Sequence, residues 1–346
     1  MAPPATTAAR PLVSVVMIFF QEERFIAEAI ESVRAQTHPE WELLLVDDGS
    51  TDGSTALARG YAERMPDRIR YLQHPGGANR GMAASRKLGM AAARGPLVAF
   101  LDADDAYLPT RLAHHVELIE RLPAPSIVIG SDLYWHSWQR DAREPDRVLA
   151  IGVRAGERYD PPRLLELMLR PGLAAAPGIC SVTFHRLEAD GTSGAPDEFV
   201  GHYEDQCLYD ALLARRPALV TDQALARYRQ HPGSFTARTA TGDAPEGHGN
   251  LAERHFLEWL RDHLAAQALL TGTVAAALAA RLAPHQDATR SAETSARRAA
   301  RAIGRLAGAA VHALPPAGER LLRRAFGALR EAARRRRIRR AERDGC

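Results

Sequence analysis

The sequence contains few cysteines and a single lysine, and each shortage excludes a class of protein. The three cysteines lie far apart and form no CxxC pair, so they predict neither a disulfide framework nor a zinc site and are typical of a reducing cytosol. The lysine, Lys87, precedes Leu88, which excludes the GxxxxGK(S/T) loop of a P-loop ATPase. Apolar runs of 18 uncharged residues are also missing, and the first residues lack the apolar core of a signal peptide. We therefore expect neither a membrane-spanning helix nor a secretion signal.

Basic charge is concentrated at the end of the chain. Residues 290–346 hold 16 Arg and five acidic residues, a net charge of +11, whereas the 289 residues before them carry a net charge of −8. Apolar residues are interleaved with the arginines, which favours a basic amphipathic helix on an anionic membrane surface, at the inner face of the cell membrane. A solvated extension that docks on the acidic body is an equal alternative. Nucleic acid is the least favoured partner, because no RNA- or DNA-binding module accompanies the arginines.

The first 110 residues alternate apolar strands with helical patterns. Strands separated by helices of this length predict an α/β fold with a mostly parallel sheet covered on both faces. The predicted strands are Val13–Phe20, Glu42–Val46, Arg68–Gln73 and Pro96–Asp102. The predicted helices are Glu23–Gln36, a helix within Ser50–Met65 that follows capping residues, and Ala78–Arg94.

After Thr110 the pattern becomes less regular. Residues 108–122 and 202–216 read as helices and residues 126–130 as a short strand, whereas residues 132–200 are rich in Pro, Gly and Arg and resist assignment. From about Leu251 the chain reads as helical and rich in Ala and Arg, after a polar, Gly-containing segment that favours a boundary near residue 245. We divide the chain accordingly into an extended N-terminus at 1–11, an α/β domain at 12–245 and a helical extension with a basic tail at 246–346.

Polar clusters follow three of the predicted strands. Ligands of parallel sheets bind beyond the carboxyl ends of the strands, so these clusters should lie along one edge of the sheet. The clusters are Gln21-Glu22-Glu23, Asp47-Asp48-Gly49-Ser50 and Asp102-Ala103-Asp104-Asp105.

The third cluster predicts a cation site. Asp102 and Asp104 are two residues apart in extended chain and can face the same way, yet two close carboxylates repel unless a cation or a proton lies between them. Mg²⁺ takes one or two protein carboxylates and completes its shell with water and substrate phosphates. The alternative is that these acids only cap a following helix. The cluster lacks the Gly of an EF-hand loop, where Tyr107 stands, and the GxGxxG of a dinucleotide-binding turn is also missing.

Three stretches taken together resemble the family 2 glycosyltransferases. They are residues 13–54, residues 79–105, and residues 203–212 with the RYRQHPGS segment at 227–234. The resemblance covers roughly residues 12–235 and implies an inverting enzyme with the GT-A fold. Residues 12–110 would bind a nucleotide-sugar, most often UDP-linked, and residues 111–245 an acceptor, which could be a glycan, a lipid, a peptide or a small molecule. It implies Mg²⁺ or Mn²⁺ as cofactor and a place in cell-envelope or polysaccharide biosynthesis.

The resemblance also implies roles for residues of the nucleotide half. Asp48, with Asp47 beside it, would contact the base and ribose, and Arg80 would lie near the nucleotide. Asp104 would be the direct metal ligand, with Asp102 nearer the ribose or the metal's water.

Residues outside these positions receive roles in the same way. Asp205 would be the catalytic base, with Glu204 as the alternative. Arg229 would pair with phosphate oxygens, and His231 would lie near the phosphate or the metal. The sequence departs from the family where Phe20-Gln21 replaces Tyr-Asn, which would alter the rim of the nucleotide pocket that Phe20 and Glu22 form.

Simpler interpretations of some of these residues stay open. Acids near a helix N-terminus, such as Glu204 and Asp205, are favourable with the helix dipole alone. Trp135 and Trp138 could stack on an acceptor sugar, although packing is the commoner use of Trp.

The proposed chemistry explains why these residue types are needed. A metal would neutralise the leaving diphosphate, a carboxylate would take the acceptor's proton, and a single base with direct displacement inverts the anomeric centre. Two other functions are kept as alternatives. One is a catalytically inactive nucleotide-sugar-binding scaffold. The other is a nucleotidyltransferase, whose usual Gly-rich loop after the first strand is missing.

Overall fold

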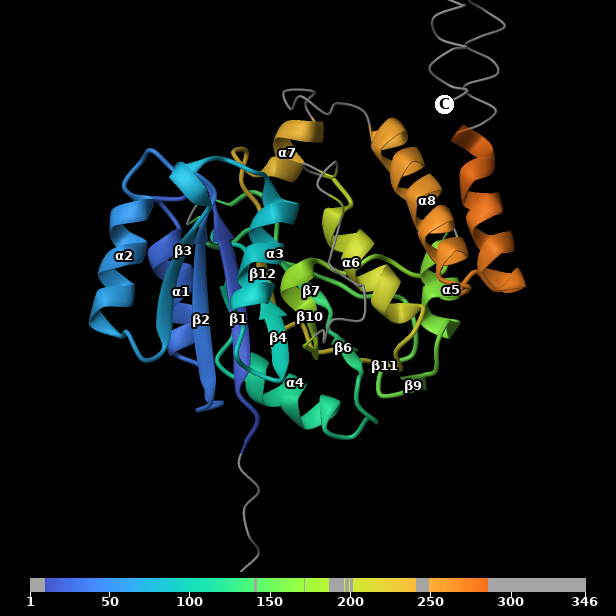
Figure 1. The fold of residues 1–346 in the computed structure, drawn as a ribbon, viewed down its shortest axis with the longest axis horizontal. Helices are drawn as coiled ribbons and strands as arrows, with labels where there is room; N and C mark the ends of the chain where they lie inside the picture. Colours follow the sequence, from blue (N-terminus) through green and yellow to red (C-terminus); the bar gives the residue numbers. More distant parts are fainter. Residues whose placement is uncertain are drawn as a thin grey trace, which may run out of the picture. The chain divides into compact units, whose positions relative to one another are not determined.

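The computed structural model describes residues 10–139, 142–170, 172–186, 196, 199, 202–240 and 249–285. Residues 1–283 form one compact unit, and a second unit begins at Pro284. The compact unit in Figure 1 therefore continues past the boundary predicted near residue 245. The basic tail and most of the extended N-terminus lie outside the described residues, so the predictions made for them stay predictions.

The first part of the central sheet consists of four parallel strands in the order β3-β2-β1-β4. β1 and β2 are buried along their whole length, which explains why they read as continuous apolar runs rather than as alternating patterns. All four strands lie at their predicted places. They are β1 (Val13–Phe19), β2 (Trp41–Asp47), β3 (Ile69–Gln73) and β4 (Leu97–Phe100).

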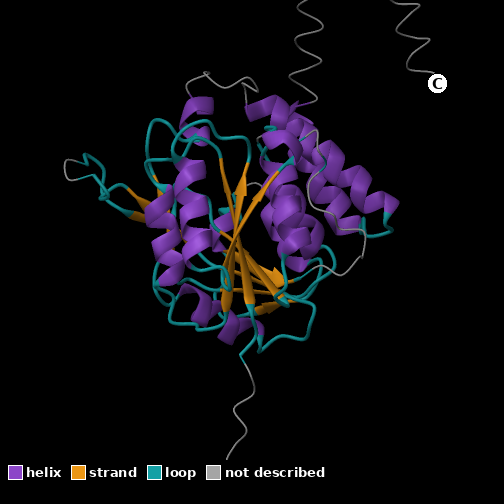
Figure 2. Ribbon diagram, turned by 60° about the vertical axis from the view of Figure 1, so that its left-hand side comes forward, coloured by secondary structure: helices purple, strands orange, loops and turns teal. Residues whose placement is uncertain are grey.

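Helices connect these strands and cover the sheet. Figure 2 shows the sheet between two layers of helices, as the alternating pattern predicts. α1 and α3 begin later than predicted, because the polar residues before them form loops at the sheet edge. The connections are α1 (Ile26–Arg34), α2 (Ser54–Arg64), the short 3₁₀ helix η1 (Pro75–Gly77) and α3 (Met82–Ala92).

The second part of the sheet mixes strand directions. β10 is antiparallel to both of its neighbours, β4 and β6, and β11 is parallel to β6 and antiparallel to β9. The strands are β6 (Ile127–Ile129), β9 (Arg158–Tyr159), β10 (Val182–His185) and β11 (Ala218–Val220). The helical segments of this part are α4 (Arg111–Ile119), α5 (Arg163–Leu169), η2 (Ile179–Ser181) and α6 (Glu204–Leu213).

A second, four-stranded sheet was not predicted from the sequence. Its order is β5-β12-β7-β8, and its strands are short, which leaves little periodicity to read. β5 directly follows the acidic cluster and pairs with β12, so this sheet fixes the loop that carries the acids. The strands are β5 (Ala106–Tyr107), β7 (Asp132–Trp135), β8 (Arg147–Leu149) and β12 (Ala226–Arg229).

The described part of the chain ends in helices, as predicted for the extension. α7 (Phe235–Ala240) precedes α8 (Gly249–Ala266), and residues 272–285 are also helical. α8 packs against α6, and its residues Phe256, Leu260 and Leu264 are fully buried in the common core. Among the described residues, no helix is both long enough and apolar enough to span a membrane.

Candidate active site

A cavity of about 660 Å³ lies where β1, β2 and β4 end. Residues that follow each of these strands line it, together with the first residues of α6. Seven of the side chains predicted for the site line this one cavity: Phe20, Glu22, Asp48, Asp102, Asp104, Glu204 and Asp205. Asp47, Arg80, Arg229 and His231 lie close to it in the fold but do not line it.

The two acids at the end of β2 are held by hydrogen bonds. The Asp47 carboxylate accepts bonds from the Ser50 amide, at 2.8 Å, and from the hydroxyls of Thr55 and Tyr71. The Asp48 carboxylate accepts two backbone amides, from Arg80 at 2.7 Å and from Gly81 at 3.0 Å. Asp47 therefore organises its own loop, whereas Asp48 ties β2 to the start of α3 at the cavity wall.

The loops that meet at Asp48 approach each other very closely. Gly49 has a φ of +85°, and a Cβ added there would lie 2.8 Å from the backbone nitrogen of Asn79. Gly81, with a φ of +83°, allows the chain to turn into α3 directly after the Arg80 amide. The backbone N–H of Arg80 is thus bound by the Asp48 carboxylate, and the predicted place of Arg80 near the nucleotide stays a prediction.

The acids that follow β4 are crowded, and their hydrogen bonds do not balance their charge. Asp105 is almost fully buried, and burial together with the charges of Asp104 and Asp102 raises its pKa well above the ordinary value. Burial also raises the pKa of Asp102, against the opposing charge of Arg86 and with the help of Asp104. On the facing loop, burial and then the charges of Asp104 and Asp102 raise the pKa of Glu22 to about 8. The cavity is therefore short of positive charge.

These residues fit a divalent cation through their carboxylates. Asp102, Asp105 and Cys180 can each place one ligand atom within 4.8 Å of the others. The Cys180 thiol has a strongly raised pKa because it is buried and lies beside Asp102 and Asp105, and it donates to Asp105 at 3.3 Å. It therefore acts as a protonated neighbour, which leaves the carboxylate oxygens, the ligands that Mg²⁺ and Mn²⁺ prefer.

Arg86 lines the cavity and was not predicted from the sequence. Its guanidinium donates to Asp102 at 2.7 Å and forms a close ion pair with Glu204, and its side chain is almost completely buried. It thereby joins the acidic loop after β4 to the acid pair of α6. The signal was present in the sequence, since Arg86 shares a helical stripe with Ala83 and Gly89 that should face the core.

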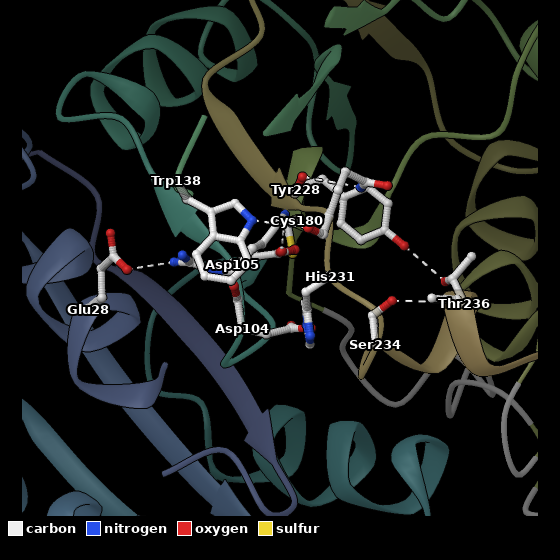
Figure 3. Close-up of polar contacts among 12 residues, drawn as sticks. Glu28, Asp104, Asp105, Trp138, Cys180, Tyr228, His231, Ser234 and Thr236 are labelled. Atoms are coloured by element: carbon white, nitrogen blue, oxygen red, sulfur yellow. Dashed lines mark hydrogen bonds and ion pairs between the residues drawn. The ribbon is translucent and has the colours of Figure 1, made fainter. Parts of the chain in front are cut away.

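Arg229 lies behind the acidic loop rather than at its surface. Its Nε donates to the Asp104 carbonyl at 2.6 Å, its Nη2 pairs with Glu28 at 2.6 Å, and its backbone N–H donates to the Asp105 carboxylate at 2.8 Å. The aromatic rings of Trp138, Phe25 and Trp135 surround the guanidinium at 4.3 to 5.0 Å. Figure 3 shows Glu28 and Trp138 on one side of Asp104 and Asp105. Arg229 is therefore placed to shape the acidic loop from within the protein.

His231, Trp135 and Trp138 lie in the group of side chains that surrounds Arg229. The His231 Nε2 lies 3.1 Å from an oxygen of Asp104, and its ring packs against Phe25 with 4.9 Å between centroids. Trp138 packs on Phe25 and donates its indole N–H to the Gln230 carbonyl. His231 thus faces a predicted metal ligand, whereas both tryptophans pack around Arg229 and neither lines the cavity.

The residue that precedes the acid pair of α6 has a strained backbone conformation. Tyr203 has φ 66° and ψ 4°, a left-handed conformation that costs a bulky residue on the order of 1–3 kcal/mol. Glu204 is buried against Arg86, whereas Asp205 is partly exposed to the cavity. Burial raises the pKa of Asp205, against the opposing charge of Arg86. Of the two acids that line the cavity, Asp205 is therefore the more accessible to a ligand.

Parts of this chain are similar in sequence to known glycosyltransferases. Residues 14–182 match the family model described as glycosyl transferase family 2. Two similar proteins come from Bacillus subtilis (strain 168). The first, named glycosyltransferase EpsE, is 40% identical over 32% of this chain and 39% of its own length. The second, named teichuronic acid biosynthesis glycosyltransferase TuaG, is 37% identical over 32% of this chain and 42% of its own length. This chain thus spans about two-fifths of their length.

A solved structure of similar arrangement is the mannosyltransferase PcManGT from Pyrobaculum calidifontis in complex with GDP-Man and Mn²⁺. The match covers 84% of this chain and 81% of that one, at 21% identity and a TM-score of 0.48. The family match and the sheet order together confirm the resemblance seen in the sequence and the predicted α/β GT-A fold class.

Proposed function

We propose that this chain, whose residues 14–182 belong to glycosyl transferase family 2, transfers a sugar from a nucleotide-sugar to an acceptor. One observation carries the proposal. The acids that follow β1, β2 and β4 and the acid pair of α6 line a single cavity. A cavity of about 660 Å³ also falls within the range of small-molecule and cofactor sites, which is roughly 300–1,000 Å³.

The nucleotide would bind on the side of the cavity formed by β1 and β2. Asp48 lines this side with its carboxylate anchored by two amides, and Phe20 offers a half-exposed ring at the rim. A flat exposed ring beside a fixed carboxylate suits a base and a ribose. Glu22, Asp47 and Arg80 would support this region. A UDP-linked donor is the first choice, as the resemblance to the family implies.

The diphosphate would be held through a divalent cation, Mg²⁺ or Mn²⁺. Asp104 would be its ligand, with Asp102 and His231 close by, because the carboxylates here outnumber the positive charges that face them. Bound there, the cation would neutralise the negative charge of the leaving diphosphate. Arg229 contributes from behind by fixing the Asp104 backbone.

Asp205 would take the proton of the acceptor hydroxyl, and Glu204 is the alternative. Asp205 reaches the cavity, and its raised pKa makes it a stronger base than an ordinary aspartate. Glu204 is engaged by Arg86, which leaves it less free to accept a proton. One base with direct displacement would invert the anomeric centre, since a retaining double displacement requires a second carboxylate as nucleophile.

The acceptor belongs to the cell envelope or to a polysaccharide in this proposal. The name of the relative TuaG, which refers to teichuronic acid biosynthesis, supports this class. The basic tail would hold the enzyme at an anionic membrane surface, where lipid-linked acceptors are found.

A panel of UDP- and GDP-sugars with Mn²⁺ tests the proposal. Thermal shift identifies donors that stabilise the protein, and chromatography measures the nucleotide that each releases. We expect one donor to stabilise the wild type and to be consumed, and we expect Asp205→Asn to bind it without turnover. Binding without turnover in the wild type, with envelope extracts added as acceptor, would favour the inactive scaffold. Release of pyrophosphate instead of a nucleoside diphosphate would favour nucleotidyl transfer.

A further inference from the structure

α8 lies outside the stretch matched by the family model, yet it packs against the residues that lead into the acid pair. The Phe199 ring stacks on His255 with 4.7 Å between centroids and 10° between planes. The Tyr203 ring stacks on Phe256 with 5.0 Å and 11°. Phe256 is completely buried. Two parallel ring stacks therefore join α8 to Phe199 and to Tyr203, and Tyr203 directly precedes Glu204.

Tyr203 controls how α6 begins. Its carbonyl accepts the Cys207 amide at 2.8 Å, so its backbone sets the direction of the first turn, which carries Glu204 and Asp205. Its left-handed φ of 66° is unfavourable for a residue with a Cβ and persists only where surrounding contacts enforce it. The stack with Phe256 is such a contact, because it restrains the Tyr203 ring and with it the position of Cβ, which changes when φ changes.

α8 is itself anchored by further contacts. Arg281, from the helix at 272–285, pairs with Glu253 of α8 at 2.8 Å. Leu257 and Leu264 are fully buried in the core, as is Phe256. α8 is thus a firm support rather than a loosely attached extension.

We propose that α8 braces the catalytic acid pair, and that Phe256 and Tyr203 are positioning residues. The stack of their rings holds Tyr203 left-handed, and this conformation directs the Asp205 carboxylate into the cavity. The inference rests on the proposed function, because it assigns the brace to the base of that reaction.

Phe256→Ala tests the brace, with Leu264→Ala as the matched control. Both remove a fully buried side chain from α8, but Leu264 lies two turns further along and carries no ring on Tyr203. Release of UDP from UDP-GlcNAc, and of GDP from GDP-mannose, gives kcat, and titration with UDP or GDP gives the nucleotide Kd. We expect Phe256→Ala to lower kcat about 10- to 100-fold, since small displacements of a reacting group are costly. Its nucleotide Kd should stay within about 2-fold, and Leu264→Ala should keep both values.

Hydrogen exchange at the Cys207 amide tests the brace without any substrate. We expect exchange there to be faster in Phe256→Ala and unchanged in Leu264→Ala. If Phe256→Ala does not fold, Phe256→Leu should show the same differences at smaller size. Equal kcat or equal exchange in the two variants would overturn the brace. If the wild type consumes neither donor, the choice of donor or the proposed function is at fault, and the exchange measurement still decides on the brace.

Discussion

The acids at the end of β2 and the acids at the end of β4 occupy the same edge of the sheet in opposite surroundings. Asp47 and Asp48 accept backbone and hydroxyl hydrogen bonds at each of their oxygens. Asp102 and Asp105 are crowded by other carboxylates, and their pKa values are raised by burial and by these neighbours. Identical side chains at equivalent strand ends can therefore differ in how far hydrogen bonds already compensate their charge, which is compensated for Asp47 and Asp48 and not for Asp102 and Asp105.

The largest difference between the two loops should appear in turnover. We expect Asp104→Asn to reduce donor turnover about 100- to 1,000-fold, because it removes the charge that would hold the cation. Stability should change by less than about 1 kcal/mol, since the side chain is near the surface of the cavity. Chemical denaturation and nucleotide release on the same preparation measure both effects. Wild-type turnover in Asp104→Asn would show that the acids after β4 do not hold a cation that the reaction needs.

The second test concerns the acids after β2, where we expect a large effect on stability and a small effect on turnover. Asp47→Ala removes the acceptor for one amide and two hydroxyls, so we expect a loss of about 2–4 kcal/mol in the free energy of unfolding. Turnover of the protein that remains folded should fall much less than in Asp104→Asn. Urea titration measures the loss. A stable Asp47→Ala protein without activity would instead place Asp47 on the nucleotide.

Arg86→Lys tests the link between the acidic loop and the acid pair. Lysine keeps the charge but cannot reach Asp102 and Glu204 with two separate nitrogens. We expect turnover to fall about 10-fold or more, with nucleotide affinity retained. The comparison of kcat with the nucleotide Kd separates these effects. Wild-type turnover would show that the bridge has no part in the reaction.

The last expected effect concerns stability as a function of pH and leaves the reaction itself unchanged. Burial raises the pKa of Asp210 to about 8, against the charge of Arg281, and one oxygen of Asp210 has no partner among the described residues. The folded state therefore binds this proton more tightly than the unfolded chain, whose aspartate pKa is about 4, so stability falls as pH rises from about 4 to 8. Asp210→Asn should remove this slope and add on the order of 2 kcal/mol at pH 8. Thermal unfolding from pH 5 to 8 measures it, and parallel curves for the two proteins would refute it.

The sequence predicted the strongly periodic half of the fold and the edge at which the acids meet. β1 to β4 are apolar and separated by helical patterns, so a mostly parallel sheet could be predicted, whereas the strand order β3-β2-β1-β4 could not be read from the chain. The small sheet was missed, because β5 has only two residues and β12, although as long as β4, is polar and only partly buried, so neither forms an apolar run.

The partners of individual side chains depend on contacts that sequence spacing does not reveal. Arg229 stands where the resemblance implies a phosphate ligand, but its burial among aromatic rings depends on Phe25, which is far away in the sequence. The stack of Phe256 on Tyr203 likewise joins two helices through tertiary packing alone. The helices and strands could thus be predicted where local sequence pattern decides them. The contacts and roles of single side chains could not be predicted where they depend on elements far apart in the sequence.

The anomalous difference map of a crystal soaked with Mn²⁺ and UDP tests the account most directly. The proposed function predicts one strong manganese peak in the cavity, in contact with the Asp104 carboxylate and with both phosphates. The same peak should be lost in Asp104→Asn. A peak elsewhere, or UDP bound with no manganese beside these acids, would contradict it.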